Sequence, residues 1–595
     1  MSKRKKYGIA SIFLGIAKIA PAKFVLQYFS TVANGVAMAF IAIATNKLFS
    51  AILAYSEGKA SLPWVLEGIF FLVAITLSYE LFSGISAYYG EVYYYLSTQH
   101  IQKTVNAKAS RLSCMDYEKP SVLNSMQSAY DGSGSAIDLA NIVMDILTLY
   151  IPYFIIYGVY LFCLWPPLLL IFPLIILPTL AGQLCKVKFS ICEEQKNAPL
   201  RRKRDAYMAY IGDRNYVKET RLLGVIPYFL NELKHTCAQI RTISVAAKTK
   251  SWYVSLAVDC LNMLGYGGVV FLLIHSVYTG KIPIATFAAV FSTCGMLIDM
   301  EKELFGNQLG ELAEQYGSVK QFIDFMNRPE QTDSGCEVSR IREVRMDGVS
   351  FCYPSADQPR VPVIQDIQLS LKAGESLAVV GSNGSGKTTL TKLLLGLYPP
   401  DTGTIFYDGI AHRELNPASL RHKSTAVFQN FIKYRFLLQD NIALSEAVDM
   451  GKVADALCKA QLEYSNPHFF PEGTETMLSK EFGGTDLSGG QWQKVAIARG
   501  IYHTGDLVVL DEPTSAIDPV NEYHLYQCFA DMVKGRIGVL VTHRLGLAKL
   551  CTRIAFLKEG RILALGTHEQ LLKTCPEYDE LWEAQTERYQ EADSC

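Results

Sequence analysis

The sequence has few charged residues and no excess of either sign. Lysine and arginine together number 56, aspartate and glutamate number 57, and charged residues make up only 19% of the chain. Soluble proteins average roughly 25%. Proteins that bind nucleic acid through its phosphates carry a basic surplus, so the balance excludes nucleic acid as an expected partner. The 14 cysteines include no Cys-x-x-Cys pair, so nothing indicates a zinc or thiol redox site.

Long apolar stretches fill the first half of the chain. A helix needs about 20 apolar residues to cross a bilayer, and six stretches reach that length: 24–53, 62–96, 135–164, 167–190, 251–279 and 283–305. Several are longer than a bilayer requires, so we expect helices that continue beyond the membrane. A chain of 595 residues is also too long for one core and predicts at least two domains.

The connections between these stretches differ in charge. Those after the second and fourth stretches are long and basic, whereas 56–61, 165–167 and 280–282 are short and nearly uncharged. The positive-inside rule therefore predicts a multi-pass plasma-membrane protein with both termini in the cytoplasm. The basic run at 3–6 precedes a short apolar stretch that Lys18 interrupts. This pattern favours an interfacial amphipathic helix over a cleaved signal peptide.

A phosphate-binding loop lies at Gly381–Thr388, with the sequence Gly-Ser-Asn-Gly-Ser-Gly-Lys-Thr. Its glycines let backbone N–H groups surround phosphate oxygens, Lys387 reaches the β- and γ-phosphates, and the Thr388 hydroxyl can ligate Mg²⁺. We expect a buried strand over Ser376–Val380 and a helix over Thr389–Leu397. The residues assigned to ATP here are Ser382, Asn383, Gly384, Ser385, Gly386, Lys387, Thr388 and Thr389.

Two further motifs follow in order. Leu487–Gln491 reads Leu-Ser-Gly-Gly-Gln, and the apolar run at 507–510 ends in Asp511 and Glu512. A carboxylate at the end of a buried strand needs a partner, which for Asp511 would be Mg²⁺. A phosphate loop, this pentapeptide and this acidic strand end, in this order, resemble the ATP-binding cassette (ABC) family.

The resemblance implies a role for each matching residue in ATP hydrolysis. The pentapeptide residues Ser488, Gly489, Gly490 and Gln491 would close over the γ-phosphate of an opposite subunit. The remaining assignments are Tyr353 stacking on adenine, Gln429 reaching Mg²⁺ and the membrane domain, Glu512 as general base, His543 on the γ-phosphate, and Asp518 on the partner's phosphate loop. The active unit would then need two cassettes. A homodimer is favoured because every hydrolytic element is present, although a heterodimer stays open.

The resemblance also implies the fold class and the domain organisation. Six membrane spans ahead of one cassette resemble exporter-type (type IV) half-transporters: a six-helix transmembrane domain over 1–326, a linker over 327–344 and an α/β P-loop nucleotide-binding domain over 345–595. The stretches 116–120 and 218–224 are similar to the family's two intracellular loop motifs, which carry short coupling helices.

The sequence constrains the transported substrate and the direction of transport less than it constrains the nucleotide site. Residues 428–434 and 481–484 resemble those of Gram-positive lantibiotic and peptide exporters, which favours a bacterial exporter of a peptide or a drug-like amphiphile. Acidic residues in or near the spans indicate either a cavity for a cationic peptide or helix ends exposed in the cytosol: Glu80, Glu91, Asp145, Asp259, Asp299 and Glu301. The alternatives are a siderophore-type importer, one half of a heterodimeric multidrug exporter, and an ATP-switched regulator or channel. The intact Glu512 argues against the last.

Overall fold

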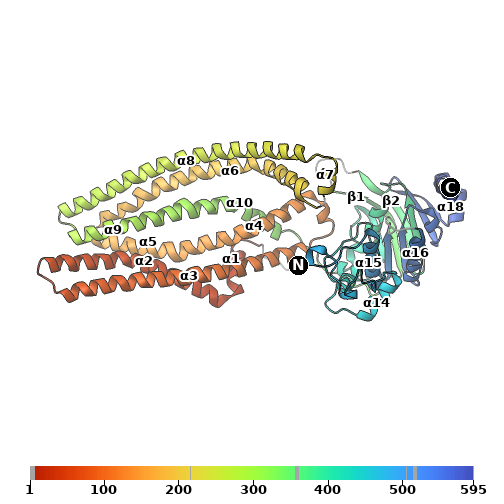
Figure 1. Cartoon of the computed structure of the whole chain (residues 1–595), viewed down its shortest axis with the longest axis horizontal. Coiled ribbons are helices and arrows are strands. Elements are labelled where there is room, and N and C mark those ends of the chain that lie inside the picture. Colours follow the sequence, from red (N-terminus) through yellow and green to blue (C-terminus); the bar gives the residue numbers. More distant parts are fainter. Residues whose placement is uncertain (1–6, 215, 355–360, 504, 513–518, 594–595) are drawn as a thin grey trace. The chain divides into compact units, whose positions relative to one another are not determined.

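The computed structural model describes residues 7–214, 216–354, 361–503, 505–512 and 519–593. The chain divides into two compact units. The first comprises Met1–Ser110 and Asn124–Arg328, and the second comprises Arg111–Leu123 and Pro329–Cys595. In Figure 1 the first unit is entirely helical, whereas the second contains all the labelled strands.

The first unit confirms the six predicted spanning helices. Within the described residues, six helices are long and apolar enough to cross a membrane: Pro21–Ser56, Leu62–Ala109, Pro120–Leu164, Pro166–Glu194, Ile226–Tyr278 and Ile284–Met326. A shorter apolar helix, α1 (Ile9–Ile19), precedes them. Most of the helices run past the predicted apolar stretches, because polar residues in helical register extend them beyond the length that a bilayer needs.

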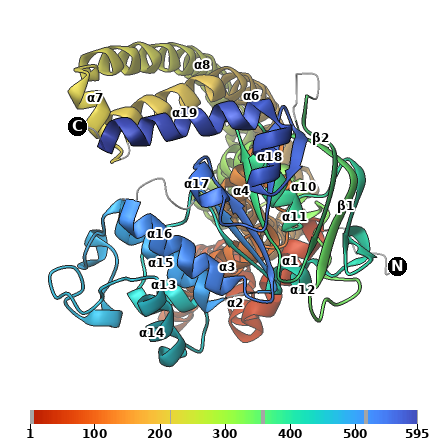
Figure 2. The same ribbon diagram turned by 90° about the vertical axis from the view of Figure 1, so that its right-hand side faces the viewer.

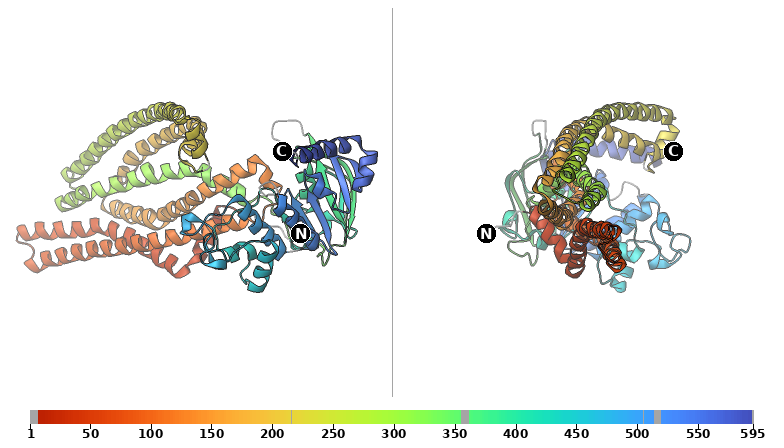
Figure 3. Two further views of the ribbon diagram at one scale, coloured as in Figure 1. Left: turned by 45° about the vertical axis from the view of Figure 1, so that its right-hand side comes forward. Right: turned by 90° about the vertical axis from the view of Figure 1, so that its left-hand side faces the viewer.

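These helices pack in pairs. Helix α2 (Pro21–Ser56) lies along α3 (Leu62–Ala109), and α6 (Ile171–Gly212) lies along α8 (Ile226–Tyr278), as Figures 1 and 3 show. The other helices of this unit are α4 (Pro120–Asp145), α5 (Ile151–Leu164), α7 (Val217–Leu222), α9 (Ile284–Glu301) and α10 (Leu309–Met326).

Two π-helical turns interrupt this unit. Ile146–Tyr150 joins α4 to α5, and Lys302–Gln308 joins α9 to α10. A buried cluster beside them includes Tyr153, Tyr157 and Cys294. π-Helical turns occur mostly as single insertions and often at functional sites. The residues around these two turns are therefore candidates for a functional role.

The second unit contains two sheets. A four-stranded antiparallel sheet has the order β2-β1-β4-β5, and a six-stranded sheet has the order β10-β9-β3-β8-β7-β6. The strands are β1 (Glu343–Cys352), β2 (Pro362–Lys372), β3 (Ser376–Gly381), β4 (Thr402–Tyr407), β5 (Ile410–Ala411), β6 (Ser424–Val427), β7 (Leu507–Asp511), β8 (Ile537–Val541), β9 (Arg553–Lys558) and β10 (Arg561–Gly566).

Helices cover the larger sheet. Figure 2 shows α13, α14, α15 and α16 grouped on one side of this unit. The helices are α11 (Lys387–Leu394), α12 (Pro417–His422), α13 (Leu438–Ala443), α14 (Met450–Lys459), α15 (Gly489–Tyr502), α16 (Pro519–Met532), α17 (Leu545–Ala548), α18 (His568–Thr574) and α19 (Pro576–Asp593). Strands β3, β7 and β8 are buried along their whole length, as expected for a parallel sheet that is covered on both faces.

The sheet topology positions the site. Strands β3, β8, β7 and β6 are neighbours and run parallel, so their carboxyl ends meet at one edge, where α/β sheets bind ligands. The strand predicted at Ser376–Val380 is β3. The helix predicted at Thr389–Leu397 is α11, but its limits differ. It begins at Lys387, directly after the left-handed Gly386 at φ +101°, and ends at Leu394, before Gly396 at φ +66°.

A short segment of the first half of the sequence belongs to the second unit. Arg111–Leu123 contains the 3₁₀ turn Asp116–Glu118, within the first predicted loop motif. The Glu118 carboxylate accepts a hydrogen bond from the Tyr398 hydroxyl and lies 3.6 Å from Lys392 Nζ. Met115 packs against the apolar core formed by β1, β2 and α11. The loop between α3 and α4 is therefore anchored to the cassette through one carboxylate and one apolar side chain.

Candidate active site

A cavity of about 730 Å³ opens at the carboxyl ends of the parallel strands. Residues that follow four separate strands line the cavity, because β3, β8, β7 and β6 are neighbours and end at the same edge of the sheet. The lining residues are Val363, Asn383, Gly384, Gly386, Lys387, Thr388, Thr389, Gln429, Glu512, His543 and Arg544.

The loop between β3 and α11 forms one wall of the cavity. Gly386 has φ +101°, and a Cβ there would lie 2.8 Å from Ile364 Cδ1 and 2.9 Å from the Val363 carbonyl oxygen. Only glycine fits both the backbone angle and the space. Lys387 is 6% exposed, and its Nζ donates to the carbonyl oxygens of Gly381 at 2.9 Å and Ser382 at 3.0 Å. The ammonium group is thus fixed at the mouth of the loop, where an anion would sit.

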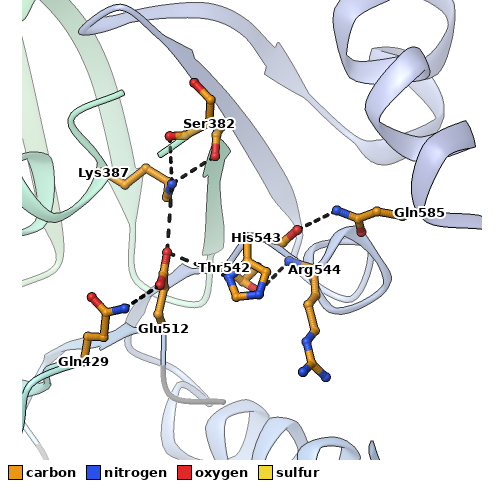
Figure 4. A network of polar contacts seen from close by, with 9 residues as sticks. Ser382, Lys387, Gln429, Glu512, Thr542, His543, Arg544 and Gln585 are labelled. Carbon is orange, nitrogen blue, oxygen red and sulfur yellow. Dashed lines mark hydrogen bonds and ion pairs between the residues drawn. The ribbon is translucent and has the colours of Figure 1, made fainter. Parts of the chain in front are cut away.

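Glu512 lies near three other polar side chains that line the cavity (Figure 4). Its Oε2 accepts a hydrogen bond from Gln429 Nε2 at 2.8 Å. Its Oε1 lies 3.9 Å from both Lys387 Nζ and His543 Nδ1. The residue has φ +46°, a conformation that costs an ordinary side chain of order 1–3 kcal/mol and is concentrated at functional sites. The strand end therefore turns this carboxylate into the cavity at the expense of local backbone strain.

The C-terminal helix positions the histidine loop. Gln585 of α19 donates from Nε2 to the His543 carbonyl oxygen at 2.6 Å (Figure 4). It also accepts a hydrogen bond from the Leu545 N–H at 2.9 Å. Arg544, beside His543, lines the cavity. Sequence reasoning missed both Gln585 and Arg544, because neither lies in a motif and Gln585 reaches the site only through the tertiary fold.

Asp511 lies buried beneath the loop and is 1% exposed. Burial raises the pKa of this carboxyl group, and the nearby Thr388 hydroxyl and Lys387 ammonium oppose the shift. Among the described residues, none makes a hydrogen bond of normal geometry to either oxygen. Two unpartnered carboxylate oxygens beside a hydroxyl fit a hard cation such as Mg²⁺, which prefers oxygen ligands.

Other residues assigned from the sequence lie away from the cavity or outside the described residues. Tyr353 does not line the cavity. Its ring packs edge-on against Phe351 and Tyr398, and its hydroxyl lies 3.1 Å from Thr389 Oγ1. Ser488 is the N-cap of α15, where its hydroxyl accepts from the Gln491 N–H. No residue of Leu487–Gln491 lines the cavity of this chain. Asp518 lies outside the described residues.

Comparisons with known proteins agree with this geometry. Residues 364–515 match the family described as ABC transporter. The chain is 30% identical over 554 residues to the subtilin transport ATP-binding protein SpaT of Bacillus subtilis, covering 88% of this chain and 87% of that protein. It is 29% identical over 401 residues to the nisin transport ATP-binding protein NisT of Lactococcus lactis subsp. lactis, covering 65% of each. A solved bacterial Atm1-family ABC exporter with ATP bound shares the fold, with a TM-score of 0.74 at 20% identity over 95% of this chain and 98% of that chain.

Proposed function

The chain belongs to the ABC transporter family, and we propose from this membership that it exports a peptide or an amphiphilic molecule from the cytoplasm by alternating access. It is a multi-pass membrane protein with an ATP-binding domain, and hence an ATPase coupled to transport. The relatives named for subtilin and nisin transport favour a peptide as the substrate.

One observation carries this proposal. Lys387, Gln429 and Glu512 meet in one cavity of a chain that also contains six spanning helices. A regulator that uses ATP only as a switch has no need for a general base held in a strained conformation. The hydrogen bond from Gln429 to Glu512 instead favours repeated hydrolysis that is linked to movement of the strand ends.

The proposed mechanism assigns one task to each side chain. Lys387 and the N-terminus of α11 hold the phosphates and neutralise charge that develops on them. Glu512 polarises the attacking water, while Gln429 holds that carboxylate in place. His543, on the loop braced by Gln585, would hydrogen-bond the γ-phosphate. Because phosphoryl transfer depends mainly on positioning and charge stabilisation, this arrangement supplies the main requirements.

Mg²⁺ is part of the proposal. Thr388, Gln429 and Asp511 would hold it. When bound, the ion supplies positive charge next to the β- and γ-phosphate oxygens. Asp511 supports this assignment, because its buried carboxylate oxygens have no hydrogen-bond partner of normal geometry among the described residues and would be stabilised by a cation.

A dimer is also proposed. Ser488, Gly489, Gly490 and Gln491 do not line this chain's own cavity, yet they begin a helix whose N-terminus suits a phosphate. A second copy would bring its pentapeptide and its Asp518 to this phosphate loop, so we favour a homodimer. Tyr353 keeps its proposed place beside the adenine.

The cellular arrangement completes the proposal. The chain would lie in a bacterial plasma membrane. The basic connections favour an orientation with both termini in the cytoplasm. The proposed organisation is a membrane domain over 1–326, a linker over 327–344 and a nucleotide-binding domain over 345–595. Strand β1 begins at Glu343 and thus takes up the end of that linker.

Vesicle transport tests the proposal. The purified protein is reconstituted in proteoliposomes, and uptake of a fluorescent lysine-containing apolar peptide into the vesicles is measured. ATP is added only outside the vesicles, so it drives only those transporters whose cassettes face outward. ATP-dependent uptake that Glu512→Gln abolishes supports export. ATP-dependent loss of preloaded peptide from the same vesicles would establish import, and hydrolysis without movement of peptide in either direction would overturn the proposal.

A further inference from the structure

The sixth spanning helix contains a buried carboxylate that has no hydrogen-bond partner in the part of the chain that the structure describes. Glu301 is the last residue of α9 and is 0% exposed. Both of its oxygens, Oε1 and Oε2, lack a hydrogen-bond partner among the residues that the structure describes. An unpaired carboxylate in an apolar interior is costly, so it must carry a proton or meet a cation.

The basic residue next to Glu301 does not supply that cation. Lys302 follows it in sequence, but Lys302 is exposed and its Nζ lies 3.8 Å from Asp259 Oδ1 of α8. Asp299, on the same helix, is exposed. Lys302 thus pairs with an exposed carboxylate, and no described residue pairs with Glu301.

The other polar groups around Glu301 do not neutralise it. Tyr153 on α5 and Cys294 on α9, both buried, lie within its electrostatic range, and neither carries a positive charge. The two oxygens of an ionised Glu301 are hydrogen-bond acceptors, so a group that satisfies them must be a donor.

A π-helical turn lies directly beside the carboxylate. Lys302–Gln308 begins where Glu301 ends α9. Such a turn weakens the regular i→i+4 ladder and is frequent at functional sites.

We propose that the Glu301 carboxylate is the binding point for a cationic group, an ammonium or a guanidinium, of the transported substrate. The inference rests on the proposed export function and narrows its substrate class to molecules with a positive charge beside apolar groups. An ammonium group supplies three donors to the acceptor oxygens, and a charge-assisted hydrogen bond is roughly twice as strong as a neutral one.

Two matched variants test the site. Glu301→Gln removes the charge with little change of shape, and Asp299→Asn removes an exposed charge from the same helix. ATPase stimulation is measured with an apolar lysine peptide and with the same peptide acetylated on its lysines. We expect wild type and Asp299→Asn to respond to the charged peptide at about tenfold lower concentration. Glu301→Gln should respond to both peptides at similar concentrations.

A second measurement uses the unaltered protein, in case Glu301→Gln does not fold. The apolar reagent dicyclohexylcarbodiimide modifies buried carboxyl groups, and mass spectrometry locates the adduct. We expect labelling of Glu301 that the lysine peptide suppresses and its acetylated form does not. Equal labelling of Glu301 with either peptide would overturn the inference.

The outcomes separate this inference from the export proposal. If both peptides stimulate wild type equally and Glu301→Gln behaves in the same way, peptide export stands and the role of Glu301 is wrong. If neither peptide stimulates hydrolysis or moves across vesicles, the peptide proposal fails. Charge-dependent protection of Glu301 from carbodiimide then still decides whether it binds cations.

Discussion

Gln429 donates a hydrogen bond of 2.8 Å from its side-chain amide to Oε2 of Glu512. Gln429 comes shortly after β6, and Glu512 comes directly after β7; these two strands are parallel neighbours. A shift of the segment after β6 therefore changes the position of the proposed base directly. Movement of this segment would therefore alter hydrolysis through the bond between Gln429 and Glu512.

Glu512→Gln should lower the rate of ATP hydrolysis by about 10²–10⁴-fold, because an amide cannot accept the proton of the attacking water. ATP binding should persist, since Lys387 and the loop are unchanged. Steady-state ATPase assays and nucleotide-binding titrations check both points. Glu559→Gln is the control, because Glu559 also has a positive φ but is exposed. Equal hydrolysis by both variants would refute the role of Glu512.

Gly386→Ala should weaken ATP binding by at least about tenfold, because its Cβ would approach Val363 and Ile364 within 3.0 Å in a left-handed conformation. Gly409→Ala is the matched control. Gly409 has φ +82° and nothing within 4 Å of an added Cβ, so it carries the backbone cost without the clash. Fluorescent-nucleotide titration of both variants separates the two effects, and identical affinities would show that the loop tolerates a side chain.

Asp511→Asn should stabilise the nucleotide-free protein at neutral pH. Burial raises the pKa of Asp511 above its ordinary value of 3.8. As the pH rises from 3.8 through the raised pKa, the unfolded chain ionises while the folded one retains its proton, so the free energy of unfolding falls. Thermal melting across that range should show a shallower loss of stability for the variant.

The same variant should lose most of the Mg²⁺ dependence of ATP binding, because the amide leaves the ion without its carboxylate ligand. Asp531→Asn, at an exposed position, serves as the control. It should neither stabilise the nucleotide-free protein nor reduce the Mg²⁺ dependence of ATP binding. A variant that is less stable than wild type at neutral pH, yet still responds to Mg²⁺, would contradict the assignment.

Mixing two inactive chains should restore activity if the sites are shared. Lys387→Ala disables the phosphate loop. Gly490→Asp places a negative charge opposite the phosphate, while α15 should tolerate an acidic residue in its first turn. In a mixed dimer one site carries both defects and the other carries neither. Equal mixing should therefore recover about a quarter of wild-type hydrolysis, since half of the dimers are mixed. No recovery after verified subunit exchange would contradict the shared site.

Glu118→Gln should reduce the stimulation of hydrolysis by substrate while leaving basal hydrolysis nearly unchanged. Burial and the Glu118 carboxylate raise the pKa of Tyr398, so its hydroxyl stays protonated and donates to that carboxylate. The amide weakens this bond and removes the charge facing Lys392. Glu414→Gln, on the exposed surface of the same unit, is the control. Stimulation that matches this control would assign Glu118 a purely structural role.

The residues that form local motifs could be identified from the sequence alone. The glycine-rich loop, Asp511 at the end of an apolar strand and the six apolar stretches each depend on residues close together in the chain. The predicted strand at Ser376–Val380 and the six spans are therefore confirmed. The limits of α11 were misplaced because the backbone angles of Gly386 and Gly396, not hydrophobic periodicity, set its ends.

The sequence by itself determined which side chains are available for nucleotide chemistry and which stretches can enter a bilayer, because both follow from residue type and spacing along the chain. Only the tertiary structure decided that Gln585 braces the His543 loop and that Arg111–Leu123 joins the cassette. It also decided that Glu301 is enclosed with no hydrogen-bond partner among the described residues. These relationships join residues far apart in the chain, and they arise from strand order and helix packing, which no local pattern encodes.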